Sequence, residues 1–290
     1  MNWTYWILSS ALFLACYDLA KKASVRANAV LPVLLCSTSF GCMAFVSSVA
    51  LGGNAAAMLH VGTETLLLAF SKSCIVATSW IFTFMALRTL PITIATPIRA
   101  SAPALVFLVA LFIYSEVPTF LQAVGMITTF AGYWLFSWAG RHEGIDFLRN
   151  RAVWCAVAGA CCSAASSLWD KYCFQVRAAN VEAVQFYFQI GLVIVYGTLL
   201  AGQRLLKLRH DRFEWRWTIP FVGILLAAAD WLYFTGLSEP GVPISVASLM
   251  RRLSVAITFV LGARFFHETN LARKAVALAL IIGGIALLCL

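Results

Sequence analysis

The feature that most constrains this sequence is a nearly unbroken succession of apolar runs. Each run is about 20 residues long, which is enough to cross the ~30 Å hydrocarbon core of a bilayer as a helix. The 290 residues are 62% hydrophobic and 11% charged, whereas a soluble domain carries about 25% charged residues. We predict ten membrane-spanning helices, at residues 3–20, 30–51, 65–87, 91–114, 118–138, 152–173, 183–202, 217–237, 242–264 and 270–290.

The connections between these runs are short and leave no stretch that would fold as a soluble domain. The predicted fold class is therefore an all-α membrane protein. Residues 1–20 lack the positively charged leading region of a signal peptide, so we expect them to be retained as the first helix.

Lysine and arginine are distributed unevenly between the two faces of the predicted bundle. One face collects most of them, including the basic connection 203–216, and the other has Lys171 and Arg177. The positive-inside rule makes the basic face cytoplasmic and puts both termini outside the cytoplasm. We expect a multi-pass protein of the cell membrane, in bacteria the inner membrane. Because the rule also explains the net charge of +9, nucleic-acid binding is not indicated.

The sequence contains none of the common signatures of catalysis or metal binding. Its nine cysteines lie within or at the ends of apolar runs, its four histidines are scattered, and it has no CxxC pair. No metal site is predicted on that pattern. There is also no P-loop, HExxH or GxSxG motif. We expect no enzyme activity and no cofactor, and any transport would be driven by gradients or exchange instead of ATP.

The sequence repeats itself at an offset of 152 residues. A repeat of five helices is odd in number, so the second copy would enter the membrane from the opposite face, as in the inverted repeats of secondary transporters. We predict two inverted five-helix repeats, at residues 1–145 and 151–290. The aligned residues are Asp18 with Asp170, Pro91 with Pro243, Arg99 with Arg251, Glu116 with Glu268, and Gly132 with Gly284.

Both repeats resemble a known family. The block "PITIATPIRASAP" to "YSEVPTFLQAVGMITTFAGYWL" and its partner "PISVASLMRRLSVA" to "FHETNLARKAVALALIIGGIAL" are similar to the EamA-type repeats of the drug/metabolite transporter superfamily. Each half of those proteins carries a glutamate just after its fourth helix and glycines in its fifth. The resemblance implies a ten-helix transporter. It implies no single substrate, because the superfamily handles amino acids, sugars, nucleotide sugars, phosphorylated metabolites and amines.

Several charged residues fall deep inside the predicted helices. A charge facing lipid there costs about 2.5 to 3.5 kcal/mol or more, so such residues face a bundle interior or a wet cavity. Basic residues outnumber acidic ones, which favours an anionic group on the substrate. The alternative is that Asp18, Asp170, Glu116 and Glu268 neutralise the arginines in permanent ion pairs. The deep residues are Lys72, Arg99, Arg251, Arg252 and Asp230.

Helical spacing adds neighbours to the predicted cavity. Ser79 lies on the same helix face as Lys72, with Trp80 at the edge of that face, and Tyr233 follows Asp230 by three residues. Of the two adjacent arginines we expect Arg251 to face the cavity because it is the repeated one. The predicted substrate-binding residues are Arg99, Arg251, Lys72, Asp230, Trp80, Ser79 and Tyr233.

Asp18 and Asp170 lie near the ends of the first and sixth predicted helices, with Lys21 and Lys171 close by. One interpretation is local ion pairing at the membrane interface. The other is a gating or proton-coupling site, because a carboxylate that alternates between wet and dry surroundings changes its pKa.

Together these observations predict a secondary transporter that moves a small polar metabolite, anionic or zwitterionic, through a central cavity between the repeats by alternating access. The alternatives are a flippase for a lipid-linked or amphipathic substrate and a non-transporting membrane scaffold. The expected partners are the lipid bilayer and a small-molecule metabolite, and self-association as a homodimer stays open.

Overall fold

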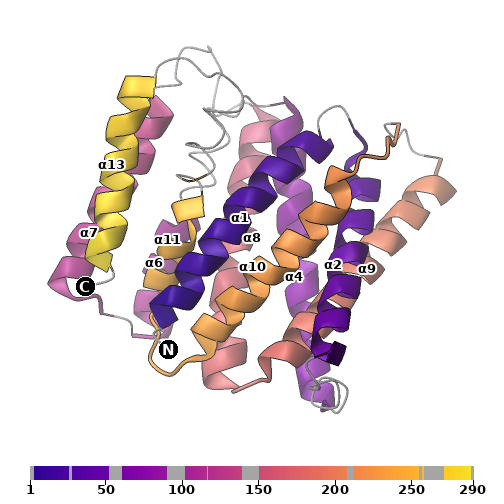
Figure 1. Ribbon diagram of the computed structural model, residues 1–290, viewed down its shortest axis with the longest axis horizontal. Coiled ribbons are helices and arrows are strands. Elements are labelled where there is room, and N and C mark those ends of the chain that lie inside the picture. The colour runs from indigo at the N-terminus through magenta and orange to yellow at the C-terminus, as the bar shows by residue number, and fades with distance from the viewer. Residues whose placement is uncertain are drawn as a thin grey trace. The chain divides into compact units, whose positions relative to one another are not determined.

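The computed structural model describes residues 3–25, 28–51, 61–89, 102–115, 117–138, 150–207, 212–254, 257 and 271–288. Within these residues the chain is helical and contains no strand. The helices are shown in Figure 1. They are α1 (Trp3–Val25), α2 (Val30–Leu51), α4 (Thr63–Thr89), α6 (Ala102–Ile113), α7 (Phe120–Trp138), α8 (Arg151–Lys171), the π-helix η1 (Tyr172–Val176), α9 (Val181–Leu205), α10 (Thr218–Ser238), α11 (Ile244–Arg251) and α13 (Leu271–Leu288).

Each predicted membrane helix corresponds to one described α-helix, and α2 has the predicted bounds. Five of the described segments are long and apolar enough to cross a membrane: Val30–Ala50, Thr63–Thr83, Arg151–Val176, Val181–Leu205 and Thr218–Ser238. The chain is thus an integral, multi-pass membrane protein.

Two predicted helices differ from what the structure describes. For the predicted helix at 91–114 the described part is α6, and residues 90–101, including Arg99, lie outside the described residues. The predicted helix at 242–264 is interrupted, because α11 ends at Arg251 and the backbone N–H of Arg252 bonds to the carbonyl oxygen of Leu249 at 3.0 Å. This tight turn leaves two arginines at the negative end of the α11 dipole, a stabilising position for cations.

The chain divides into two compact units. The first consists of residues 1–77 and 170–240, and the second of residues 78–169 and 241–290. Each unit therefore takes helices from both predicted repeats. The chain passes from the first unit to the second within α4, after Ala77, and returns within α8, at Asp170.

In the first unit α1 and α10 lie side by side (Figure 1). The Ser10 hydroxyl on α1 donates to the carbonyl oxygen of Ala229 on α10 at 2.6 Å. On its other side α10 meets α2, where a Cβ atom added to Gly41 would lie 2.6 Å from the carbonyl oxygen of Gly223. Glycine at both positions lets the two backbones touch, which is a common basis of tight packing between membrane helices.

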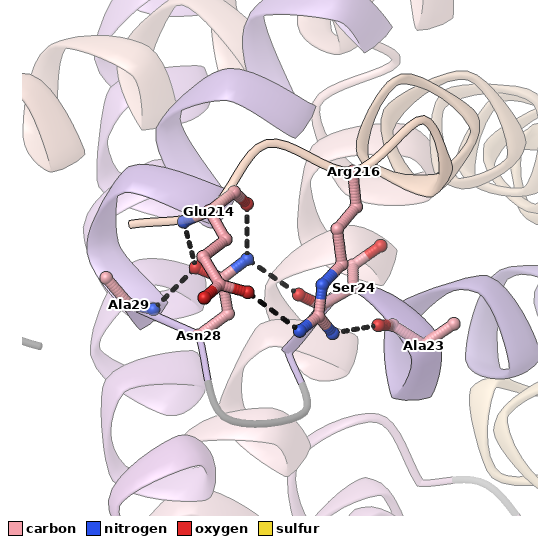
Figure 2. Close-up of polar contacts among 6 residues, drawn as sticks. All are labelled: Ala23, Ser24, Asn28, Ala29, Glu214 and Arg216. Carbon is pink, nitrogen blue, oxygen red and sulfur yellow. Dashed lines mark hydrogen bonds and ion pairs between the residues drawn. The ribbon is translucent and has the colours of Figure 1, made fainter. Parts of the chain in front are cut away.

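Asn28 ties the turn between α1 and α2 to the segment that precedes α10 (Figure 2). Its amide nitrogen donates to the carbonyl oxygens of Ser24 at 3.0 Å and Glu214 at 2.7 Å. Its amide oxygen accepts from the backbone N–H groups of Ala29 at 2.8 Å and Glu214 at 2.9 Å. Asn28 is 5% exposed, and the four bonds satisfy its polar atoms. These two connections therefore lie at the same end of the first unit.

In the second unit α7 and α13 lie side by side, and α11 packs against α6 (Figure 1). Gly284 of α13 faces Gly125 and Thr129 of α7, and the missing side chain lets the two helices approach closely. The Ser79 hydroxyl on α4 donates to the carbonyl oxygen of Gly159 on α8 at 2.8 Å, which joins these two helices.

Candidate functional site

The centre of the candidate site is an ion pair between Lys72 on α4 and Asp170 near the end of α8. The Lys72 ammonium group donates a hydrogen bond to the Asp170 carboxylate. Their side chains are 3% and 5% exposed. A pair buried this deeply in apolar helices is costly to desolvate, and removing one partner leaves the other charge uncompensated. The structure thus brings together a predicted substrate-binding residue and a predicted gating residue.

This pairing corrects the predicted charge balance. The sixth helix was expected to end near residue 173, which left Asp170 at the interface beside Lys171. Through η1 the membrane-spanning segment continues to Val176, so Asp170 lies further inside and is 3% exposed. Asp170 therefore belongs to the deep charges, and the predicted excess of deep positive charge falls by one.

A close contact between α4 and α9 fixes the surroundings of Lys72. The hydroxyl of its neighbour Ser73 donates to the carbonyl oxygen of Phe188 on α9 at 2.8 Å. A Cβ atom on Gly191, one turn further along α9, would lie 2.8 Å from the Cβ of Ser73. Only glycine allows this approach, and the approach puts Phe188 beside Lys72.

Two aromatic rings face the Lys72 ammonium group. Its nitrogen lies 4.9 Å from the centre of the Phe188 ring and 4.4 Å from that of Phe234 on α10. Cation–π attraction at such distances is worth about 2 kcal/mol when the cation is desolvated. The Phe174 ring, in η1, lies 5.0 Å from Phe234 and backs this wall. The cation is thus held by one carboxylate and two ring faces.

The π-helix η1 follows Asp170 almost directly. Single π-turns within α-helices are frequent at functional sites. Cys173 and Phe174 in η1 are 0% and 3% exposed, and the Gln175 side chain donates to the carbonyl oxygen of Leu237 at 3.0 Å. These contacts attach η1 to the end of α10 and keep Phe174 against Phe234.

Two buried glutamines lie on α9, four residues apart and therefore on one face of the helix. Gln185 is 0% exposed and Gln189 is 5% exposed. The Gln185 side-chain nitrogen donates to the carbonyl oxygen of Ala227 at 3.3 Å. Within the part of the chain that the structure describes, the side-chain oxygens of both glutamines lack a hydrogen-bond partner. Each is a desolvated acceptor within one turn of Phe188.

The remaining predicted site residues are divided between the units. Asp230 and Tyr233, 8% and 1% exposed, lie on α10 of the first unit within one turn of Phe234. Asp18, on α1 of the same unit, is partly exposed.

Ser79, Trp80 and Arg251 belong to the second unit. Ser79 is engaged by α8 through its bond to Gly159, and Trp80 is partly exposed. Arg251 ends α11, and the Arg252 guanidinium lies 3.4 Å from the Ser163 hydroxyl. Arg99 lies outside the described residues.

A second ion pair joins the start of α4 to the segment after η1. Arg177 pairs with Glu64, and their side chains are 44% and 57% exposed. The hydrogen bond to Glu64 and the charge of that carboxylate raise the pKa of the Arg177 guanidinium above its ordinary value. Arg177 therefore stays charged at every working pH.

Sequence reasoning missed Phe174, Phe188, Gln185 and Gln189. The glutamines left a signal, because two amides one turn apart stand out in the apolar run 183–202. Phe188 left none, since the chain has 21 phenylalanines and only the fold shows which of them meets a cation.

Comparison with known proteins bears on both family and fold. The sequence pattern of the EamA-like transporter family matches residues 150–290. This confirms the predicted resemblance for that part of the chain and indicates a membrane transporter. No curated protein matches the chain. A solved crystal structure of another protein covers 98% of this chain and 95% of its own, with 17% sequence identity and a TM-score of 0.77. At that identity the likeness shows the fold alone.

Proposed function

We propose that this chain, whose second half is similar to EamA-like transporters, is a secondary transporter of a small polar metabolite. The substrate is anionic or zwitterionic, and it moves by alternating access through a central site that both predicted repeats help to form. Gradients or exchange supply the energy.

The observation that carries this proposal is the buried Lys72–Asp170 pair. Ionisable residues inside membrane helices are expensive and mark the pathways of substrates and ions. Lys72 comes from the first predicted repeat and Asp170 from the second, so the pair joins the two repeats at a polar point within apolar helices. A scaffold protein would need no such pair.

The contacts within each unit support the inverted repeats. An offset of 152 residues relates α1 to α8 and α4 to α10, and the equivalent contacts are α1 with α10 in the first unit and α4 with α8 in the second. Two further helices each contact their own counterpart, in the pairs α2 with α9 and α7 with α13. In addition α6 contacts α11, and these two helices belong to the matching predicted helices 91–114 and 242–264. Such reciprocal pairing is the pattern that a two-fold axis between repeats produces.

We also propose that the protein lies in a cell membrane, the bacterial inner membrane in particular, with both termini outside the cytoplasm. The Asn28–Glu214 bonds join two connections that the charge bias assigns to the cytoplasm. The Glu64–Arg177 pair joins two segments that the same rule assigns to the other face. An alkaline phosphatase fused to the C-terminus should be active and a fluorescent protein fused there should be dark. The reverse pattern would overturn this orientation.

Transport is tested with the purified full-length protein in liposomes. The vesicles are loaded with a mixture of amino acids, organic acids, phosphate esters, sugars and amines, and mass spectrometry measures what leaves them. We expect saturable movement of at least one anionic or zwitterionic compound. Movement should be lost in Asp170→Asn and Lys72→Gln variants that still insert in the membrane. Arg99→Ala and Arg251→Ala should also abolish it.

Arg177→Gln serves as the matched control, since Arg177 is charged and paired but exposed, and this variant should retain transport. If no compound moves faster than in empty vesicles, or if the Asp170→Asn and Lys72→Gln variants transport normally, the proposed function is wrong.

A further inference from the structure

We propose that the connection between α9 and α10 is a docking surface for the headgroups of anionic phospholipids. We call it the headgroup surface, and it consists of Arg204, Lys207, Arg212, Trp215 and Trp217. It is separate from the Lys72–Asp170 site and does not depend on which metabolite the protein moves.

The headgroup surface lies where two membrane spans end. One span runs over Val181–Leu205 and the next over Thr218–Ser238. The residues that join them therefore lie at the boundary between the lipid tails and water, where headgroups are found. At the end of α9 Leu205 and Leu206 are 83% and 72% exposed, so acyl chains can cover apolar side chains directly beside the basic ones.

The charge of this surface is complementary to phosphate. Arg204, Lys207 and Arg212 are exposed, and none of the three forms an ion pair within the described residues. Glu214, the one acidic residue described in this connection, lies 3.4 Å from the Arg216 guanidinium, which offsets its charge. Lys207 and Arg212 are five residues apart in sequence, so their Cα atoms are at most about 18 Å apart. The basic groups thus gather over an area that a few headgroups occupy.

Hydrogen bonds hold the second half of the connection in place (Figure 2). The backbone carbonyl oxygen and N–H of Glu214 bond to the Asn28 side chain at 2.7 and 2.9 Å. The Arg216 guanidinium donates to the carbonyl oxygen of Ala23 at 2.6 Å. These bonds attach the segment to the turn between α1 and α2, so a bound lipid does not have to order it.

Two tryptophans complete the headgroup surface. The Trp215 ring lies 6.0 Å from the Phe40 ring on α2 and 6.3 Å from the Trp217 ring. Trp215 and Trp217 are 46% and 79% exposed. Tryptophan prefers the membrane interface, where its ring meets acyl chains and its N–H meets headgroups. A soluble acidic partner would use the cations but not these apolar groups at membrane level, so the combination favours a lipid.

The backbone at Lys207 is a further observation. Leu206 caps the end of α9, and Lys207 follows it with a φ of 49°. Glycine usually takes this left-handed position after a helix, because a side chain is strained there. Glycine would fit this backbone better, whereas lysine adds a cation at the membrane surface.

Lipid competition tests the inference on the purified full-length protein in detergent. The protein is mixed with equal amounts of phosphatidylglycerol and phosphatidylcholine that have the same acyl chains, and native mass spectrometry measures which lipid stays bound. We expect an excess of phosphatidylglycerol. Because one basic residue near an anionic surface is worth about fivefold in binding, the excess should fall at least about fivefold in the triple variant Arg204→Gln, Lys207→Gln, Arg212→Gln. Equal binding of the two lipids by the parent, or an unchanged excess in the triple variant, would overturn the inference.

The first control separates this surface from diffuse positive charge. Arg151, at the start of α8, is also exposed, and the charge bias assigns it to the same face of the membrane. Arg151→Gln should keep the excess of phosphatidylglycerol. If it loses as much of that excess as Arg204→Gln does, the headgroup surface does not select the lipid and the inference is wrong.

A second variant keeps the test independent of folding. Lys207→Gly removes the charge and suits the left-handed backbone, so we expect the lipid-free melting temperature to stay the same or rise while the excess of phosphatidylglycerol falls. The matched control is Ala178→Gly, since Ala178 also has a φ of 49° but carries no charge. This variant should bind the lipids as the parent does. Unchanged lipid selection in Lys207→Gly would contradict the role of Lys207.

Soluble anions separate a lipid from other occupants. Binding of phosphatidylglycerol should raise the melting temperature in a concentration-dependent way. Inorganic phosphate and a peptide of glutamates carry negative charge without acyl chains and should have little effect. If either stabilises the protein as strongly as phosphatidylglycerol does, the surface is a site for a soluble anion or an acidic protein, and lipid docking is wrong.

Discussion

Two ion pairs connect the same two stretches of chain in contrasting surroundings. The first part of α4 carries Glu64 and Lys72, and the chain around η1 carries Asp170 and Arg177. The Lys72–Asp170 side chains are 3% and 5% exposed, whereas Arg177 and Glu64 are 44% and 57% exposed. Water can replace either partner of the exposed pair, but only another charged group can replace a partner of the buried one. Burial, and not the presence of opposite charges, makes one pair a candidate site.

The largest effect should come from Asp170→Leu. This change leaves the Lys72 ammonium group buried without a counter-charge, which lowers the free energy of unfolding by about 3 to 5 kcal/mol. Unfolding in mixed micelles with increasing denaturing detergent measures the loss. The control is Asp18→Leu, the repeat-related but partly exposed carboxylate, which should cost no more than about 1 kcal/mol. Equal losses of unfolding free energy in the two variants would show that burial does not distinguish Asp170 from Asp18.

Replacing both partners should recover most of that loss. The double variant Lys72→Met with Asp170→Leu leaves no buried charge, and apolar replacements of buried pairs are often neutral or stabilising. We expect a free energy of unfolding within about 2 kcal/mol of the parent, with transport still absent. A double variant as unstable as Asp170→Leu alone would show that packing, not charge, sets the cost.

A smaller effect is expected from Phe234→Leu, which keeps an apolar side chain but removes a ring face from Lys72. The loss in unfolding free energy should be about 1 to 2 kcal/mol, and part of it should vanish when Lys72 is already methionine. Phe45→Leu is the control, since Phe45 is buried in an apolar cluster with Val49 and Ala227. If the Phe234 loss is the same in both backgrounds, the ring contributes packing alone.

The smallest effect should follow Arg177→Gln. Exposed pairs contribute little because water and salt screen them. We expect the melting temperature to match that of the parent protein at both low and high salt, as measured by scanning fluorimetry. A clear loss in this variant would mean that the exposed pair also holds α4 to the segment after η1, and the contrast between the pairs would weaken.

Local sequence properties were enough to predict the helices but not their irregularities. The length of the apolar run predicted the bounds of α2, because the run is about as long as a helix that crosses the bilayer. The π-turn of η1 and the turn at Arg252 depend on contacts such as Gln175 with Leu237, which lie far apart in sequence. Neither the polar residues around η1 nor the two arginines at the end of α11 indicate a π-turn or a tight turn on their own.

The candidate site was predicted in part. Lys72 and Asp170 were identified one at a time, because each is a charge in or near an apolar run. Their pairing spans 98 residues and has no equivalent in the other repeat, since the position aligned with Lys72 is Ile224. The repeat therefore predicted the positions that the two halves share, but it could not predict the ion pair, which involves a lysine present in one half alone. The roles of Arg99, Arg251, Asp230, Trp80, Ser79, Tyr233 and Asp18 stay predictions.

The π-turn after Asp170 has a mechanical consequence. Such a turn holds one residue more than an α-turn. If η1 relaxed to ordinary α-geometry, every residue beyond it would rotate by about 100° around the helix axis. Phe174 would then move away from Phe234, and the aromatic rings that face the Lys72 ammonium group would lose the support of Phe174. The direction of the helix axis would not change. A change of η1 from π- to α-geometry would therefore move the aromatic wall by rotating the end of the sixth membrane segment around its axis, without bending the helix.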